Sequence, residues 1–320
     1  MRCAALVAAA GVRGRLSVLI YHRILPEPDD VNRWDVTAAE FERQMRALRE
    51  SFSPLPLSEA LERLAKRSLP RRAVAVTFDD GYADNAEVAL PILRRCGVPA
   101  TFFVATGYLN GGRMWNDSVV EAIRRLPGPT ADLRPVGLGV LDIGDSDRRR
   151  DAIAGILGRW KYEAATDREA RATAVAVLAG LLPMRDLMMR DDQVRCLRAA
   201  GMEIGAHTVS HPILARCADA DAEREIVDSG RYLAELLREP IPLFAYPNGR
   251  PGKDYEARHV AMVRRAGYRA ALSTAPGVAV AETDRYQLPR FTPWDRDPGK
   301  FSFRLAVNFR KAMPETVAMM

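Results

Sequence analysis

Short apolar runs of strand length recur along the chain, and stretches of helical period lie between many of them. Apolar runs that are continuous, rather than alternating with polar residues, are typical of strands buried on both faces of a parallel sheet. The runs that we predict to be strands are Leu16–Tyr21, Ala73–Phe78, Ala100–Val104, Met202–Ala206, Pro242–Ala245 and Arg269–Ser273. The pattern therefore predicts an α/β protein.

Start and stop signals place helices between these strands. Thr37 and Glu40 form a capping box at the start of a stretch whose apolar residues recur at helical spacing. Further helices are predicted over 84–96 and 191–200, each ended by a glycine and followed by a predicted strand. This repeated order predicts a mainly parallel sheet with helices outside it, and a closed barrel or an open doubly wound sheet would satisfy it equally.

The stretch from residue 111 to 190 breaks this rhythm. It holds a Pro-Gly-Pro turn at 127–129, a charged run at 145–151, and helical segments around 153–160 and 170–181. We interpret it as a helical insertion, a cap, within a single domain that spans residues 1–320. No internal repeat is evident in the chain.

Charge and composition narrow the class of partner. The chain has 320 residues, is 48% hydrophobic, and carries 47 Lys and Arg against 41 Asp and Glu, a net charge of +6. The arginines are scattered, and no dense basic block with interleaved aromatics is present, so we predict no nucleic-acid partner. A solvated arginine-rich surface explains the charge, and a mild preference for acidic glycans or an anionic membrane surface is the alternative.

The cysteines and the N-terminal residues give evidence on where in the cell the protein is found. The four cysteines form no Cys-x-x-Cys pair and no regular spacing, which favours a reduced, cytoplasmic protein. Residues 1–10 are largely apolar, but arginines follow, and no run reaches the roughly 20 apolar residues that a membrane span needs. We predict neither a cleaved signal nor a span, and a peripheral membrane contact through the N-terminus stays open.

Two adjacent carboxylates end one of the predicted strands. The run Val74–Phe78 is followed at once by Asp79, Asp80 and Gly81. Active sites of α/β proteins gather at the carboxyl ends of parallel strands. Neighbouring aspartates repel one another unless a cation or hydrogen bonds compensate them. A helix cap followed by a turn is the competing interpretation of these residues alone.

Two of the four histidines, His207 and His211, follow another predicted strand. A helix or a turn there would put both imidazoles on the same side. Together with the carboxylates, the pair predicts a divalent metal site with positions left for water and substrate. Zinc suits these ligands best, and Co²⁺, Mn²⁺, Fe²⁺ and Ni²⁺ are compatible with them. The spare aspartate would act as the base that deprotonates water at the metal.

The two motifs together resemble those of the polysaccharide deacetylase family, the NodB-homology carbohydrate esterases. The matching segments are Thr77–Tyr82 and His207–His211, with support from Pro99–Val104, Phe244–Gly249 and Leu288–Phe291. The resemblance covers residues 16–105 and 190–292 and leaves the insertion outside it. It implies a distorted (β/α) barrel with fewer than the usual eight strands, about seven.

The resemblance also implies a role for individual residues. Asp79 would be the base, and Asp80, His207 and His211 would be the metal ligands. The backbone N–H of Tyr82 would donate to the oxyanion of the tetrahedral intermediate. The implied reaction removes N-acetyl groups from hexosamine units of a polysaccharide or glycolipid, for example in exopolysaccharide biosynthesis. Alternatives are an O-acetyl ester, a formamido sugar or another amide as substrate, and a catalytically silent glycan-binding module.

Two positions depart from the family pattern. Many members carry a further histidine, the proposed general acid, after a late strand, where this chain has Leu272–Thr274. His259 comes earlier, in a predicted helix, and we expect it at the surface. His22, at the end of the first strand, is our candidate for the acid or a substrate contact, and a structural role is its alternative. The arginine that orients the base in many relatives is missing after Tyr246, and Arg290 is its candidate substitute.

A few residues are expected to face the sugar. Trp115 in the insertion would offer an indole face to the apolar side of a pyranose, although ordinary packing beneath the cap is the competing interpretation. Tyr246, Asn248 and Arg290 complete the predicted substrate-binding set.

Overall fold

The computed structural model describes residues 13–181, 187–311 and 315–318. The chain divides into two compact units. The first comprises Met1–Glu27, Asp35–Leu109 and Met189–Met320, and the second comprises Pro28–Trp34 and Asn110–Met188. The apolar stretch at residues 1–10, for which a membrane contact was left open, lies outside the described residues.

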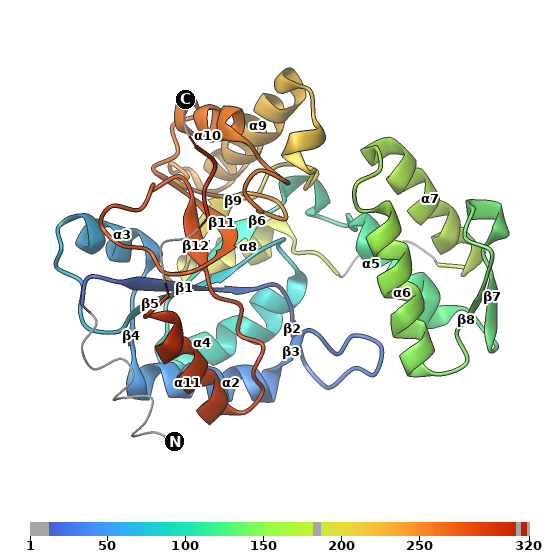
Figure 1. Ribbon diagram of the computed structural model, residues 1–320, viewed down its shortest axis with the longest axis horizontal. Coiled ribbons are helices and arrows are strands. Elements are labelled where there is room, and N and C mark those ends of the chain that lie inside the picture. The colour runs from blue at the N-terminus through green and yellow to red at the C-terminus, as the bar shows by residue number, and fades with distance from the viewer. Residues whose placement is uncertain (1–12, 182–186, 312–314, 319–320) are drawn as a thin grey trace. The chain divides into compact units, whose positions relative to one another are not determined.

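Parallel strands form the centre of the first unit (Figure 1). In spatial order they are β1 (Leu16–Tyr21), β5 (Ala73–Phe78), β6 (Ala100–Val104), β9 (Glu203–Ala206), β10 (Leu243–Ala245), β11 (Ala270–Pro276) and β12 (Leu288–Arg290). A short strand, β4 (Ser53–Pro54), adds to β5. The two ends of this order meet, because the Phe291 amide donates to the Val18 carbonyl at 2.7 Å and the Ile20 amide to the Phe291 carbonyl at 3.1 Å. The sheet is therefore a nearly closed barrel of seven parallel strands.

This barrel confirms the predicted fold and decides between the two arrangements that the strand pattern allowed. Each of the predicted strands forms, and the bounds of β1, β5 and β6 agree with the apolar runs. The strand that closes the barrel, β12, is only three residues long. Its residues were noted in the sequence only for their resemblance to the family, and the apolar pattern did not predict a strand there.

Helices cover the outside of the barrel. They are α2 (Ala38–Ser51), α3 (Leu57–Ala65), α4 (Leu90–Cys96), α8 (Asp191–Ala199), α9 (Asp219–Leu237), α10 (Ala257–Arg265) and α11 (Pro298–Asn308), with short 3₁₀ turns at Thr106–Tyr108 and Leu214–Arg216. The capping box of Thr37 and Glu40 is present at the start of α2. The helix predicted over 84–96 begins as a π-helical turn, Asn85–Ala89, before α4. Single π-helical turns are rare and often accompany functional sites.

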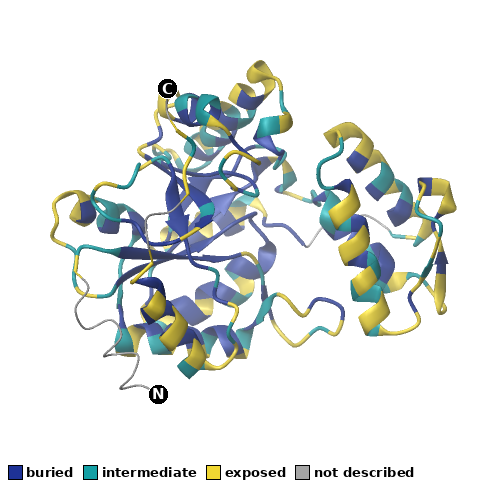
Figure 2. Cartoon of the chain, viewed as in Figure 1, coloured by how far each residue is buried: buried dark blue, intermediate teal, exposed yellow. Residues whose placement is uncertain are grey.

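The strands of the barrel are largely buried (Figure 2), and most of their buried side chains are apolar. All residues of β1, β5 and β6 are buried. The rings of Phe78 and Phe102 stack with centroids 4.7 Å apart, and Tyr21 and Phe41 join the same aromatic cluster. Such packing fixes the strands, and with them the residues at the strand ends.

The second unit is mostly helical and has a core of its own. It contains α5 (Trp115–Arg125), α6 (Ser146–Trp160), α7 (Ala165–Leu178) and a hairpin of β7 (Thr130–Asp132) and β8 (Val140–Asp142), with a 3₁₀ turn at Arg134–Val136. Its core surrounds the fully buried Trp160. Most of the predicted insertion lies here, together with loop 28–34, which Arg124 holds through an ion pair to Asp29 at 2.7 Å. That loop connects the short strands β2 (Ile24–Leu25) and β3 (Val36–Thr37) of the first unit.

None of the described helices is both long enough and apolar enough to cross a membrane.

Candidate active site

The two carboxylates stand where β5 ends. The amide of Asp79 donates to the Tyr21 carbonyl at 2.9 Å, which ties this point to the end of β1. Asp80 then adopts φ +77°, in the left-handed region that residues with a side chain rarely occupy. Both aspartates are buried, with 2% and 7% of their surface exposed. The backbone turn thus places two acids side by side in a site of low dielectric.

The two histidines stand on a tight turn after β9, and the segment is not helical. Thr208 and His211 have φ values of +66° and +52°. The Thr208 hydroxyl accepts a hydrogen bond from the His211 amide at 3.1 Å. Glu225 of α9 accepts from the amides of Val209 and Ser210, both at 2.8 Å. Left-handed backbone at non-glycine residues costs about 1–3 kcal/mol each, so packing and these hydrogen bonds must hold the turn in place.

The side chains of Asp80, His207 and His211 converge. The Oδ1 atom of Asp80 lies 3.4 Å from Nε2 of each histidine. One potential ligand atom from each residue falls within 4.8 Å of the others. The other ring nitrogen of His207, Nδ1, is 2.7 Å from the Ala245 carbonyl, to which it donates, so Nε2 faces Asp80.

The electrostatics of this cluster fit a divalent cation. Asp80 Oδ1 is buried and has no hydrogen-bond partner among the described residues, which is costly for a carboxylate oxygen. Burial would raise the pKa of Asp80, but the neighbouring His211 and a hydrogen bond from His207 outweigh it and hold this pKa well below its ordinary range. Burial would lower the pKa of His207, but the two aspartates in turn raise it, so loss of its proton would accompany metal binding. Burial lowers the pKa of His211 to about 4, so its imidazole is neutral at pH 7. An ionised carboxylate and neutral imidazole are the forms that bind metal.

Arg290 holds Asp79 with both ends of its guanidinium. Its two terminal nitrogens donate to the two carboxylate oxygens, each at 2.7 Å, and its Nε donates to the Ser273 carbonyl at 2.8 Å. Burial would raise the pKa of Asp79, but the charge of Arg290 and then that of His207 lower it overall. Asp79 is therefore ionised, and the geometry of Arg290 fits the base-orienting role predicted for it better than a substrate contact.

The two remaining histidines lie in different surroundings. His22 follows β1 directly and is exposed. The carbonyl of Tyr21, the residue before it, accepts from the Asp79 amide at 2.9 Å, so the backbone at His22 lies beside the aspartates. His259 was predicted at the surface, and that prediction is wrong: it is fully buried. Its Nδ1 accepts from the Glu256 amide at 2.9 Å and caps α10, a role in which the imidazole replaces the usual Glu or Gln.

The other predicted residues are placed as follows. The Tyr82 ring is buried, with the Arg23 guanidinium 5.0 Å from its centroid. Tyr246 is fully buried, stacks on Tyr255 with ring centroids 4.0 Å apart, and donates its hydroxyl to the Tyr286 carbonyl. The predicted contact between its side chain and substrate does not fit this burial.

Asn248 and Trp115 were also predicted to contact substrate. Asn248 is half-buried with φ +58°, and its carbonyl accepts from the Thr274 hydroxyl at 2.7 Å. Trp115 belongs to the second unit, where it packs against that unit's core with the Arg168 guanidinium 4.9 Å from its ring centroid. This contact is the packing that the competing interpretation of Trp115 described, and a sugar-facing role stays a prediction.

Residues that position the site were missed from the sequence. Glu225 lies in an amphipathic helix, where nothing about its spacing sets it apart from its acidic neighbours. Asp84 and Asn85 follow the aspartate motif and bind the chain next to His22. The sequence could have drawn attention to Asp84 and Asn85 as polar residues at the start of a helix. It could not have shown that they bind residues 22–24.

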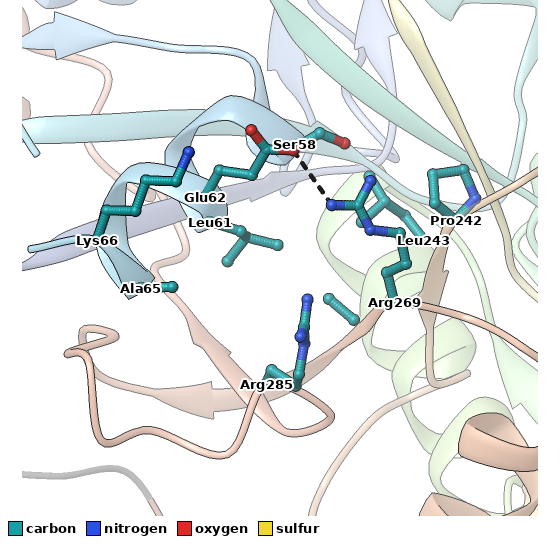
Figure 3. Close-up of a pocket in the computed structure, with 10 residues that line it drawn as sticks. Ser58, Leu61, Glu62, Ala65, Lys66, Pro242, Leu243, Arg269 and Arg285 are labelled. Carbon is teal, nitrogen blue, oxygen red and sulfur yellow. Dashed lines mark hydrogen bonds and ion pairs between the residues drawn. The ribbon is translucent and has the colours of Figure 1, made fainter. Parts of the chain in front are cut away.

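A separate pocket lies at the N-terminal ends of two strands, opposite to the ends that carry the aspartates and histidines. Figure 3 shows the residues that line it. Its volume is about 380 Å³, and it lies between α3 and the starts of β10 and β11. Leu243 and Ala270, the first residues of those strands, line it together with Arg269, which is paired with Glu62 at 3.1 Å. Active sites of such barrels lie at the carboxyl ends, so this pocket is not part of the site.

Comparison with known families identifies the family to which this chain belongs. The model of the family described as polysaccharide deacetylase matches residues 66–128 and 151–271, more than half of the chain. The chain belongs to the polysaccharide deacetylase family. This membership confirms the family predicted from the two motifs and makes the protein a hydrolase of carbon–nitrogen bonds other than peptide bonds.

Relatives of this polysaccharide deacetylase extend over most of its length. The Bacillus subtilis (strain 168) protein YxkH is 22% identical over 278 residues, which cover 86% of this chain and 70% of YxkH. The Streptococcus pyogenes deacetylase PplD, solved in complex with acetate, has a TM-score of 0.62 at 20% identity and aligns over 93% of this chain and 99% of its own. IcaB from Ammonifex degensii has a TM-score of 0.59, also at 20% identity, over 92% and 97%. At this identity the two structures bear on the fold alone.

Proposed function

We propose that the protein removes N-acetyl groups from hexosamine units of a polysaccharide, with Asp79 as the base beside a divalent ion held by Asp80, His207 and His211. One observation carries this proposal: an ionised Asp79, bound by Arg290, lies next to a buried Asp80 oxygen that has no hydrogen-bond partner in the described parts of the chain. The first group can accept a proton and the second needs a cation. Together they meet the two requirements of metal-assisted hydrolysis.

A relative supports the choice of glycan. The Staphylococcus aureus (strain N315) protein named poly-beta-1,6-N-acetyl-D-glucosamine N-deacetylase is 33% identical over 93 residues, which are 29% of this chain and 32% of that protein. We therefore propose N-acetylglucosamine units as the substrate. Of the predicted sugar contacts, Asn248 and Trp115 stay within the proposal. A cytoplasmic location with peripheral membrane contact is kept as an expectation.

Zinc is the ion that we propose, because one carboxylate and two imidazoles are a common catalytic zinc set, and Co²⁺, Mn²⁺, Fe²⁺ and Ni²⁺ accept the same ligands. When bound, such an ion polarises the amide carbonyl and lowers the pKa of water. The hydrogen bond from His207 Nδ1 to the Ala245 carbonyl fixes the ring so that Nε2 is the ligand atom.

The residues of the chain then move the protons. Asp79 takes a proton from the attacking water while the water oxygen bonds to the amide carbon. Arg290 keeps both carboxylate oxygens in place during this step. The Tyr82 backbone N–H is proposed to donate to the oxyanion. His22 is proposed to protonate the leaving nitrogen as the carbon–nitrogen bond breaks, so that acetate and a free amine leave.

The test measures acetate and free amine released from N-acetylglucosamine oligomers by zinc-loaded protein. We expect the two products in equal amounts, and a loss of about 10²–10⁴-fold in Asp79→Asn, the usual contribution of a general base. The matched control is Asp192→Asn, an exposed aspartate that is also paired with an arginine, Arg190, at 3.0 Å.

The other outcomes separate the alternatives. Acetate without amine, and only from O-acetylated glycan, would make the protein an esterase. No acetate from either substrate, with oligosaccharide bound equally by wild type and Asp79→Asn, would make it a glycan-binding module. Full activity of Asp79→Asn would refute the mechanism.

A further inference from the structure

The segment that follows the aspartate motif binds the chain immediately after His22. The Asn85 side-chain amide donates to the His22 carbonyl at 2.8 Å. Asp84 accepts from the Arg23 guanidinium at 2.9 Å through one oxygen and from the Ile24 amide at 3.1 Å through the other. Asp84 and Asn85 thus bind three consecutive residues, 22–24. We call Asp84 and Asn85 the acid–amide clamp.

The clamp is buried and internally linked. Asp84 and Asn85 have 7% and 0% of their surface exposed. The Asn85 amide also donates to Asp84 Oδ1 at 3.1 Å, which fixes both side chains. Arg23 is half-buried and lies over the Tyr82 ring. Charge-assisted hydrogen bonds in such a site are stronger and better defined than those at a surface.

His22 itself is exposed, in contrast to the two clamp residues that bind the backbone beside it. On its N-terminal side, the Tyr21 carbonyl accepts from the Asp79 amide at 2.9 Å. On its C-terminal side, Asp84 and Asn85 bind the backbone from the His22 carbonyl to the Ile24 amide. The same short segment, from Asp79 to Asn85, therefore carries the base, one metal ligand and the groups that fix the backbone around His22.

We propose that Asp84 and Asn85 are positioning residues that hold His22 at a fixed place relative to Asp79 and the metal ligands. The inference rests on the proposed function, since it gives His22 a catalytic task. A side chain that transfers a proton must lie within hydrogen-bond reach of its target, and a displacement of about 1 Å can cost about 100-fold in rate. Asn85 is the first residue of the π-helical turn, a feature that often accompanies functional sites.

The experiment is a double-mutant cycle on kcat between Asn85→Ala and His22→Ala, with zinc-loaded protein and N-acetylglucosamine oligomers. We expect Asn85→Ala to lower kcat by about 100-fold with KM changed by less than about threefold. In the His22→Ala background it should cause no further loss. Asp84→Asn, which keeps its shape but loses its charge, is the second variant and should lower kcat in the same way.

The matched control is Asn308→Ala, at the other end of β1. Asn308 is also buried, and its amide donates to the Gly277 carbonyl at 2.9 Å and to the Ser17 hydroxyl at 3.0 Å. This variant should leave kcat within about twofold, since it breaks bonds of the same kind far from His22. A loss from Asn85→Ala that is equally large with and without His22 would overturn the proposal, because the clamp would then act on the fold in general.

A second readout does not depend on activity. The imidazole proton resonances of the four histidines can be assigned by single substitutions. In Asn85→Ala the His22 resonance should shift or broaden while that of His259 stays in place, and in Asn308→Ala neither should move. An unchanged His22 resonance overturns the clamp even if the protein is a deacetylase. A changed one in a protein that releases no acetate refutes the proposed function and leaves the structural clamp standing.

Discussion

At the scale of single residues, the pair of Asp79 and Arg290 is the arrangement on which the site depends. Both side chains are almost fully buried, with 3% and 0% exposed, and they meet through two hydrogen bonds. Asp79 was predictable from the sequence, because two acids at a strand end combined with a pair of histidines indicate a metal site more strongly than either motif does alone. Its partner was a candidate only by resemblance, because Arg290 lies on the strand that closes the barrel, and only that closure brings it to Asp79.

Removing this arginine should destabilise the protein strongly. In metal-free protein, Arg290→Met leaves the buried Asp79 charge without a partner, and we expect the free energy of unfolding to fall by about 3–5 kcal/mol. Denaturant unfolding measures it. The double variant with Asp79→Asn should regain part of this loss, because no uncompensated charge remains. A loss below about 1 kcal/mol, or no recovery in the double variant, would contradict the assignment of this pair.

At the scale of elements, the strands were predictable and the fine structure of the helix starts was not. Nearly continuous apolar runs identified β1, β5 and β6, because strands that are buried on both faces are mostly apolar; each of the three holds one buried Ser or Thr. The N-terminus of α10 shows the limit. His259 was expected at the surface because its position in a helix says nothing of which neighbour covers it, and the structure instead uses it to cap the helix.

The cap makes the stability of the protein depend on pH through His259. Burial, and then the charge of Arg258, lower its pKa to about 4 from an ordinary value of 6.5. Below pH 6.5 the unfolded chain therefore takes up a proton that the folded chain refuses. The free energy of unfolding should fall as the pH drops from about 6.5 to about 4, by an amount on the order of 2–3 kcal/mol, and then change no further through this group.

The matched variant is His259→Gln, which keeps a hydrogen-bond acceptor at this position but does not titrate. As the pH falls from about 6.5 to about 4, the free energy of unfolding should decrease in wild type more than in His259→Gln. His259→Ala should be less stable than His259→Gln at every pH, by about 1 kcal/mol, since the cap is lost and neither variant titrates. Parallel pH profiles for wild type and His259→Gln would show that the buried imidazole titrates normally.

At the scale of the whole molecule, the alternation of helices and strands predicted a parallel sheet, but only strand pairing showed that it closes. The final contact runs between Leu19 and Phe291, at opposite ends of the chain, and no local pattern encodes it. The second unit shows the same limit. Its helices were expected within residues 111–190, whereas loop 28–34 joins it through contacts that are distant in sequence.

A bound metal should stabilise the first unit as a whole. An ion that binds only the folded state adds about 2.7 kcal/mol at a concentration 100 times its Kd, so zinc should raise the Tm of metal-stripped protein measurably. His211→Ala should abolish this rise, because one of the three ligands is gone. His259→Gln removes a histidine elsewhere in the chain and should keep it. An equal zinc-induced rise in His211→Ala and wild type would place the ion elsewhere.

The most direct measurement of the central claim titrates divalent metal into metal-stripped protein and follows acetate release from N-acetylglucosamine oligomers. If Asp80, His207 and His211 hold the ion that the reaction needs, activity should start near zero and rise to a plateau at one equivalent of zinc per chain. It should stay near zero throughout in Asp80→Ala. Full activity in the stripped protein, or the same plateau in Asp80→Ala, would contradict a metal-dependent deacetylase built on these three residues.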